Sequence, residues 1–162
     1  MFSFYHKIFL LLFVTCCSSQ VFANDLAVLN PKAPPGLNFD LLDWNITVPT
    51  DANNDGKIDT IPEEFLAKGF SYKPYFYTAE DGGMVFTAFV KGPKTSKNTK
   101  YTRSELREML RRGNNRIKTQ GVNENNWVFS SVRGKEQRKA GGVDGRLEAT
   151  LAVNNVTVTG DP

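Results

Sequence analysis

The sequence predicts an all-β protein of one domain, and three observations support this prediction. Short runs of β-branched and aromatic residues recur along the chain, separated by Gly, Pro, Asn and Asp, as is typical of strands joined by turns. The 162 residues match the size of one domain. Hydrophobic residues make up 40% of the chain and charged residues 23%, which argues against disorder and against several membrane spans.

The first 23 residues have the pattern of a secretory signal peptide. Lys7 precedes a short apolar run at residues 8–14, and small residues lead to Ala23. The run is too short to cross a bilayer, which takes about 20 apolar residues. A membrane anchor, or a lipoprotein acylated at Cys16 or Cys17, are the alternatives. Cleavage after Ala23 predicts a secreted or periplasmic protein with no membrane segment.

Cleavage also removes several kinds of chemistry from the mature chain. His6 is the only histidine, and Cys16 and Cys17 are the only cysteines. The mature chain can therefore form no disulfide. It can hold no Ser-His-Asp triad, no Cys-His pair and no His-ligated zinc.

The mature chain begins with a Pro-rich lead-in at residues 24–37, which we expect to lack regular structure. Residues 38–162 are the expected domain. Residues 41–48 predict a strand that a proline ends, and residues 51–59 predict a polar loop. Residues 62–66 are expected to form one helical turn.

Further strands are predicted in the second half of the chain, at residues 84–90, 127–132, 146–153 and 156–159. A Gly-Gly turn precedes the first of them, and a loop of Lys, Thr, Ser and Asn follows it at residues 91–100. The third run alternates, so that Leu147, Leu151 and Val153 share one face of a strand.

Residues 101–112 allow two interpretations. Leu106, Met109 and Leu110 have helical spacing among good helix formers, so that propensity favours an amphipathic helix. As a strand, the segment would place Arg103, Glu105 and Arg107 on one face. Two guanidinium groups beside a carboxylate are typical of a cleft for an anionic ligand, in which Glu105 would hold both arginines. A surface ladder of ion pairs is the alternative.

The string RSELREM at residues 103–109 resembles the signature of the alginate lyases of polysaccharide lyase family seven. Residues 39–61 are similar to the first strand and loop of that family, and residues 126–151 to its middle strands. The resemblance implies a jelly-roll β-sandwich, concanavalin A-like, in which a concave sheet forms the substrate groove. It also implies that the Arg-Ser-Glu-Leu-Arg segment is a central strand of that sheet, and not a helix.

The resemblance assigns roles to three side chains. Alginate is a 1,4-linked polyuronate, and its lyases remove the proton at C5, beside the carboxylate, and expel the C4 oxygen. By resemblance, Arg103 neutralises that carboxylate, because a guanidinium fork fits its two oxygens. Glu105 is expected to orient the arginines and to bond sugar hydroxyls. Arg107 is expected to contact a second subsite or to pair with Glu105.

The family supplies proton transfer from a Gln-x-His strand motif and from a Tyr in a Tyr-Phe-Lys strand. Neither motif occurs in these 162 residues. We therefore expect an incomplete jelly-roll domain, the N-terminal portion of a longer enzyme.

The loop at residues 51–59 matches the first nine positions of a calcium loop, with Asp51, Asn53, Asp55 and Asp59 as candidate ligands. A bidentate Glu is expected at the twelfth position, where the chain has Pro62. The alternative is an Asn/Asp/Gly turn without metal. Any calcium here is expected to be structural, and no cofactor is required for the reaction.

Three functions compete for this sequence. The first is an alginate lyase, and the second is a non-catalytic jelly-roll module that binds anionic polysaccharide. The third is a nucleic-acid binder that uses basic stretches at residues 91–103 and 111–118. Secretion and a small net charge argue against the third. We expect a monomer whose partner is alginate or a related polyuronate, with no nucleic-acid partner.

Overall fold

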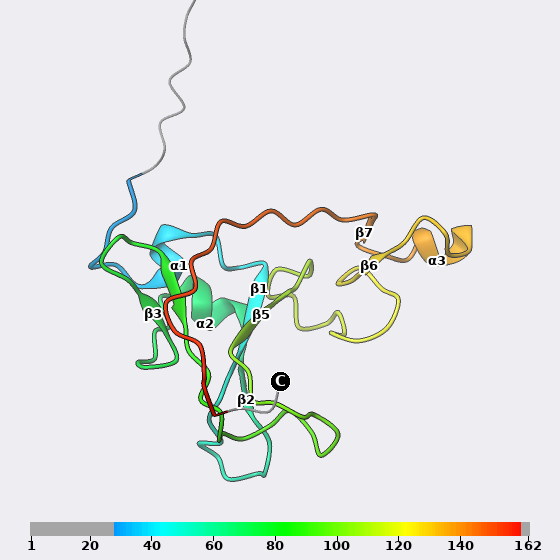
Figure 1. The fold of residues 1–162 in the computed structure, drawn as a ribbon. Coiled ribbons are helices and arrows are strands. Elements are labelled where there is room, and N and C mark those ends of the chain that lie inside the picture. Colours follow the sequence, from blue (N-terminus) through cyan, green and yellow to red (C-terminus); the bar gives the residue numbers. More distant parts are fainter. Residues whose placement is uncertain (1–27, 160–162) are drawn as a thin grey trace, which may run out of the picture.

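A three-stranded antiparallel sheet is the centre of the structure, which is a computed structural model that describes residues 28–159. Its middle strand is β1 (Trp44–Val48), with β2 (Asp59–Ile61) on one side and β5 (Glu105–Glu108) on the other (Figure 1). The predicted signal peptide and its cleavage site lie outside the described residues.

The register gives this sheet one apolar and one polar face, because opposite residues in antiparallel strands point to the same side. Ile46 of β1 lies between Ile61 and Leu106, which places three apolar side chains in one row. The neighbouring rows lie on the other side of the sheet, and we call this side the polar sheet face. Its residues are Asn45, Thr47, Thr60, Glu105 and Arg107.

The core packs against the apolar face of the sheet. It contains the buried residues Leu41, Ile46, Val48, Leu66 and Phe76. Leu66 comes from α2 (Glu63–Ala67), and Phe76 comes from β3 (Phe76–Thr78), which pairs with β4 (Met84–Phe86). Burial of each such side chain contributes roughly 1.5–3 kcal/mol. The helical turn predicted at residues 62–66 is confirmed as α2.

The Pro-rich lead-in is more regular than expected, since α1 (Pro35–Asn38) begins within it. Pro35 stands in the first turn, where a proline has the helical φ already and its missing N–H is not needed. Gly36 then lies against α2, where an added Cβ would be 1.8 Å from the carbonyl oxygen of Leu66. Only glycine permits this approach.

The prediction for residues 101–112 is settled in favour of the strand, and the helix is wrong. Leu106 packs on the core while Glu105 and Arg107 are exposed, which is the period of two that a strand requires. The expected central position is not observed. Among the described residues β5 pairs with β1 alone and therefore lies at an edge of the sheet.

Several predicted strands are shorter or absent. β4 ends at Phe86, not at residue 90, and β6 (Trp127–Val128) ends before residue 132. β6 pairs in parallel with β7 (Gly142–Val143) across α3 (Gly134–Gln137). Residues 146–159 contain no strand, and Figure 1 shows them as a single chain that runs across the molecule. Leu147 and Val158 are 77% and 94% exposed, because alternation favours a strand but provides no partner for it.

The described residues are thus mostly strands and loops with a few short helices, which confirms the predicted β class. Within residues 28–159, no helix is both long enough and apolar enough to pass through a membrane.

Candidate functional site

The predicted site lies on the polar sheet face, where β5 contributes Glu105 and Arg107. Both side chains are exposed, while Leu106 between them packs on the core. The ladder to β1 holds β5 in place, with Thr47 opposite Glu105 and Asn45 opposite Arg107. The face therefore combines charged groups with a hydroxyl and an amide, which are groups that can bond sugar hydroxyls.

Arg103 and Glu105 form an exposed ion pair at the start of β5. Nη1 of Arg103 lies 3.1 Å and 3.3 Å from the two carboxylate oxygens of Glu105. The side chains are 42% and 49% exposed, so water screens the pair and its net contribution to stability is about 0–1 kcal/mol. One guanidinium nitrogen makes both contacts. The rest of the fork can reach another anion.

Arg107 is held by a different part of the chain. Its Nη2 donates to the carbonyl oxygen of Thr119 at 2.7 Å and to Oδ1 of Asn126 at 3.2 Å. Among the described residues, Glu105 pairs with Arg103 and not with Arg107, so the expected contact of Glu105 with both arginines is not observed. A carbonyl oxygen and an amide oxygen of the segment after β5 accept from Nη2 of this guanidinium instead.

Asn126 orients the contact with Arg107. Its Nδ2 donates to the carbonyl oxygens of Thr119 at 3.2 Å and Gly121 at 3.0 Å. Because the amide nitrogen of Asn126 donates to two carbonyl groups, its amide oxygen faces the guanidinium of Arg107. This residue was not predicted from the sequence, because an Asn among several others in a loop carries no pattern.

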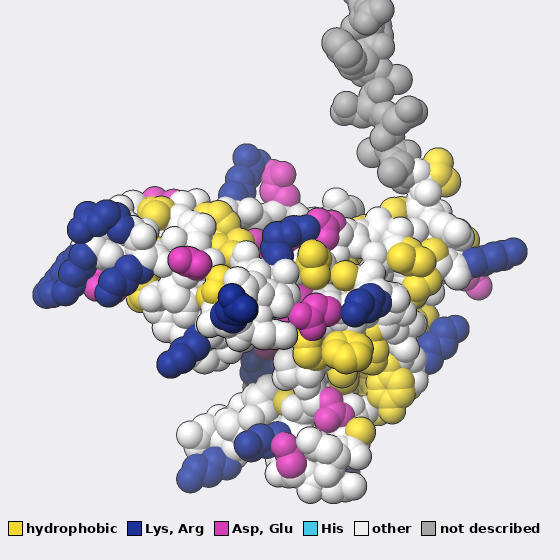
Figure 2. Space-filling model, turned by 180° about the vertical axis from the view of Figure 1, so that it is seen from behind, with side chains coloured by type: hydrophobic (Ala, Val, Ile, Leu, Met, Phe, Trp, Pro, Cys, Tyr) yellow, Lys and Arg dark blue, Asp and Glu magenta, His cyan; other side chains and the backbone are white. Residues whose placement is uncertain are grey.

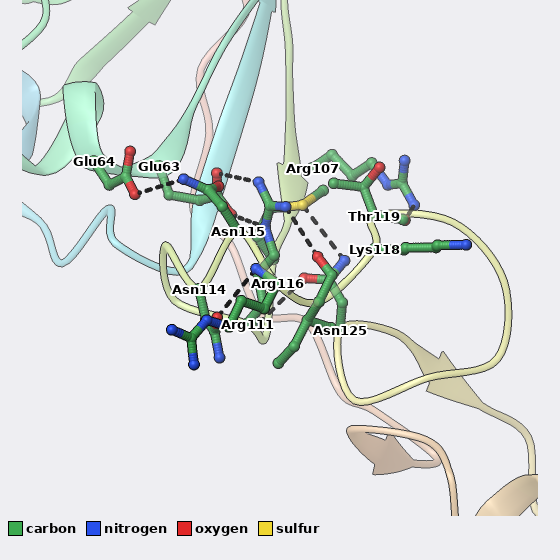
Figure 3. Close-up of polar contacts among 12 residues, drawn as sticks. Glu63, Glu64, Arg107, Arg111, Asn114, Asn115, Arg116, Lys118, Thr119 and Asn125 are labelled. Carbon is green, nitrogen blue, oxygen red and sulfur yellow. Dashed lines mark hydrogen bonds and ion pairs between the residues drawn. The ribbon is translucent and has the colours of Figure 1, made fainter.

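A buried ion pair anchors the same segment (Figure 3). Arg111 donates from Nε to Oε1 of Glu63 at 2.6 Å and from Nη2 to Oε2 at 3.1 Å. The side chains are 1% exposed for Glu63 and 11% for Arg111. Nη1 of Arg111 also donates to the carbonyl oxygen of Ile117 at 3.1 Å, and the backbone N–H of Arg111 donates to Oδ1 of Asn125 at 3.1 Å. α2 is thereby tied to the chain that follows β5.

This pair sets the charge state of both partners. Burial alone would raise the pKa of Glu63, but hydrogen bonds from Arg111 and from backbone amides outweigh it and hold the pKa below its ordinary value. The hydrogen bond to Glu63 raises the pKa of Arg111. Arg111 begins one of the two basic stretches that a nucleic-acid binder would use, but this guanidinium is neutralised inside the protein.

Two carboxylates of the candidate calcium loop already accept hydrogen bonds from within or beside the loop. Asp51 accepts from the N–H groups of Asp55 at 2.9 Å and Gly56 at 3.0 Å. Asp59 accepts from the hydroxyl of Thr50 at 2.6 Å and the N–H of Ala52 at 2.9 Å. In residues 28–159 no group of three or more His, Cys, Asp or Glu side chains has the arrangement of a metal site. The calcium role stays a prediction.

The site can thus bind and neutralise carboxylates. Arg103 supplies an accessible guanidinium, and Arg107 supplies a second one in a fixed position beside Thr47, while Asn45 on the same face is buried. The only histidine of the chain, His6, lies outside the described residues, so no imidazole is available to the site among them.

Comparisons with known proteins agree on one family. A family model described as alginate lyase matches residues 39–161. An alginate lyase of Klebsiella pneumoniae is 59% identical over 126 residues, which are 78% of this chain and 41% of the relative. The chain therefore spans about two fifths of the length of that curated relative.

One solved structure gives the same result, and a second matches less closely. The crystal structure of the alginate lyase from Klebsiella pneumoniae matches with a TM-score of 0.66 and 56% identity, over 68% of this chain and 39% of that chain. A crystal structure of the family 7 alginate lyase A1-II' in complex with substrate (GGMG) matches with a TM-score of 0.44 and 44% identity, over 54% of this chain and 34% of that chain.

Proposed function

The chain belongs to the alginate lyase family, and on that premise we propose that it is a secreted or periplasmic polysaccharide lyase that cleaves alginate by β-elimination. One observation carries the proposal. The exposed Arg103–Glu105 pair stands at the start of β5, in line with the polar sheet face that Glu105 and Arg107 share. An accessible guanidinium beside hydrogen-bonding groups is what recognition of a uronate ring requires.

The reaction explains the need for a guanidinium. Removal of the C5 proton places a second negative charge beside a carboxylate that is already ionised, and the C4–oxygen bond then breaks. Arg103, bound to that carboxylate, neutralises one charge and stabilises the developing enolate. Loss of one preorganised donor of this kind lowers a rate by roughly 10²–10³.

The two neighbouring residues have separate roles in this proposal. Glu105 orients Arg103, since it accepts from a single guanidinium nitrogen and leaves the others for substrate. Arg107 contacts the next uronate unit, held in position by Thr119 and Asn126. We assign proton transfer to none of the described residues.

The wider arrangement follows from the same family. We propose that the domain is a jelly-roll β-sandwich, that the polar sheet face lines its groove, and that the protein acts as a monomer on alginate. A calcium ion, if it occupies the loop at residues 51–59, has a structural role.

A non-catalytic module that binds anionic polysaccharide is the second candidate. It is favoured by the composition of the site, in which arginines, hydroxyls and amides bind but none of the described side chains is a histidine. Such a module needs the same polar sheet face and no acid–base pair.

Ultraviolet absorbance of the unsaturated uronate product distinguishes the two candidates. The chain is expressed together with the Gln-x-His and Tyr-Phe-Lys strands that the family supplies and is incubated with alginate, and Arg103→Ala is compared with Arg116→Ala, a matched control at an exposed arginine outside the site. The lyase predicts rising absorbance that Arg103→Ala abolishes and Arg116→Ala leaves unchanged. Binding without absorbance supports the second candidate, and absence of both binding and absorbance refutes the proposal.

A further inference from the structure

Four aromatic rings form a row that begins at the core and reaches the surface, with Phe70 and Tyr75 half-buried against the core and Tyr72 and Phe89 exposed. Ring centroids lie 6.4 Å apart for Phe70 and Tyr72, 5.7 Å for Tyr72 and Tyr75, and 5.7 Å for Tyr75 and Phe89. We call these four residues the aromatic row. Tyr72 is 43% exposed and Phe89 is 50% exposed. Exposed aromatic side chains supported by half-buried ones are compatible with a binding surface.

One end of the aromatic row lines a groove along the edge of β2. Phe70 and Tyr72 form one wall of this groove, whose volume is about 390 Å³. The hydroxyl-bearing residues Thr50 and Thr60 line it together with Asp59. A groove with an aromatic wall and a few polar groups has the composition of a small-molecule site. The carboxylate of Asp59 already accepts from the hydroxyl of Thr50 at 2.6 Å, so the aromatic wall is the part of the groove that offers a contact to a sugar ring.

The other end of the aromatic row meets a basic loop. Phe89 precedes residues 91–100, in which Lys91, Lys94, Lys97 and Lys100 are all exposed. No acidic residue occurs from residue 91 to residue 103. Within residues 28–159, no ion pair neutralises these four lysines, so the loop carries uncompensated positive charge. Figure 2 shows one face of the molecule, on which exposed hydrophobic side chains lie beside Lys and Arg side chains and some Asp and Glu side chains.

Two contacts fix the loop and the row relative to the candidate site. The hydroxyl of Thr102 donates to the carbonyl oxygen of Pro93 at 2.7 Å and closes the base of the loop just before Arg103. The hydroxyl of Ser104 donates to the carbonyl oxygen of Tyr75 at 3.3 Å. The aromatic row and the basic loop thus converge on the residues that flank Ser104.

We propose that the aromatic row and the basic loop form a second binding site for an anionic polysaccharide. Sugar rings stack on Tyr72 and Phe89, and the lysines of the loop attract the carboxylates of the same chain. Apolar ring faces and negative charge occur together in a polyuronate, which is why this ligand fits better than a neutral glycan or an acidic peptide. The inference rests on the proposed function for the identity of the polymer.

The site predicts a dependence on chain length, because a short oligouronate fills only the site at Arg103 and a long one reaches both sites. Binding of a short and a long oligouronate is measured by calorimetry for the wild type, for Tyr72→Ala with Phe89→Ala, and for Phe129→Ala as control. Phe129 is 76% exposed and lies outside the row. The double variant is expected to bind the long chain about tenfold more weakly and the short chain equally well, and the control is expected to change neither.

A second variant pair tests the charges without altering the rings. Lys94→Ala with Lys97→Ala should weaken long-chain binding, and added salt should reduce the difference from wild type, since salt screens exposed charges. Lys139→Ala, another exposed lysine, is the control. A neutral polysaccharide of the same length should bind weakly to every form.

The outcomes separate this inference from the proposed function. Unchanged long-chain affinity in both double variants overturns the second site, even where Arg103→Ala abolishes short-chain binding. Loss of long-chain affinity in both double variants supports the second site, even where Arg103→Ala has no effect. Tighter binding of single-stranded DNA than of the long oligouronate overturns the inference in favour of a nucleic-acid site.

Discussion

Removal of either partner of the Glu63–Arg111 pair should destabilise the protein strongly. Glu63→Leu leaves a guanidinium that is 11% exposed without its carboxylate, and Arg111→Met leaves a carboxylate that is 1% exposed without its guanidinium. Each single variant strands a buried charge, and breaking a buried pair in this way costs about 3–5 kcal/mol. A domain is stable by only about 5–15 kcal/mol, so either variant removes a large share of that margin.

The double variant should be milder than the sum of the two. With both charges replaced by apolar side chains of similar length, no buried charge remains, and such replacements are often neutral. We therefore expect a coupling free energy of at least about 2 kcal/mol between the two positions. A loss of 3 kcal/mol should lower the midpoint of thermal unfolding by roughly 10 °C in a domain of this size.

Urea unfolding followed by tryptophan fluorescence measures these quantities, with Trp44 and Trp127 as reporters. Arg146→Ala serves as the control, because Arg146 and Glu148 form an ion pair with side chains 82% and 72% exposed. The control should shift stability by less than about 0.5 kcal/mol. The buried-pair argument is refuted if each single variant lowers the free energy of unfolding by less than about 1 kcal/mol. It is also refuted if the effects of the two single variants add up to the effect of the double variant.

Four further predictions follow from the same contacts. Because the folded pKa of Glu63 is lowered, its stabilising effect is complete above its ordinary pKa of 4.5 and is lost as the pH falls through the folded value. The free energy of unfolding of Glu63→Gln should therefore depend less on pH below pH 4.5 than that of the wild type. An equally steep dependence on pH in both proteins contradicts this. Asn126→Ala should lower the free energy of unfolding by about 1–3 kcal/mol and weaken oligouronate binding by releasing Arg107; equal affinity in calorimetry counts against that role. Gly36→Ala should destabilise by about 1–3 kcal/mol, because its Cβ would meet the carbonyl of Leu66; a midpoint equal to wild type excludes the clash. Calcium should raise the thermal midpoint only near about 1 mM, because Asp51 already accepts two backbone hydrogen bonds that an ion would displace; a shift at micromolar calcium opposes this.

Local sequence patterns predicted correctly those strands and helices that find a packing or pairing partner among the described residues. β1 and α2 were foreseen, because one combines β-branched residues before a proline and the other is a short turn after a proline. The alternation at residues 146–153 is equally regular, but no described strand pairs with it. Periodicity states which face of a strand is apolar, and pairing decides whether the strand exists.

The segment around β5 shows the limit of propensity. Its helix formers favour a helix of two or three turns, but the ladder to β1 and the packing of Leu106 on the core stabilise a strand. The resemblance of the motif predicted this correctly. The resemblance did not predict that β5 lies at the edge of the described sheet, because that position depends on which other strands pair with it.

The sequence predicted the charged residues of the candidate site but not the residues that hold them in position. Arg103, Glu105 and Arg107 were identified, and the first two do form a pair. Asn126 and Thr119 act on Arg107 across the turn that follows β5, through a backbone carbonyl and one amide. Such contacts depend on loop geometry, which a residue pattern does not encode. The pairing of Glu63 with Arg111 was missed for the same reason, since 48 residues separate them.

The segment after β5 couples the stability of the protein to the conformation of the candidate site. Arg111 anchors this segment to α2, and the same segment offers Thr119 and Asn126 to Arg107. Proteins open locally before they unfold globally, and loops fixed by a few polar contacts open first. Acid or heat that releases Glu63 should therefore free Arg107 while the sheet persists. The proposed oligouronate binding should therefore be lost below the temperature at which Trp44 of β1 reports unfolding of the sheet, whereas Trp127, next to Asn126, should report the local opening.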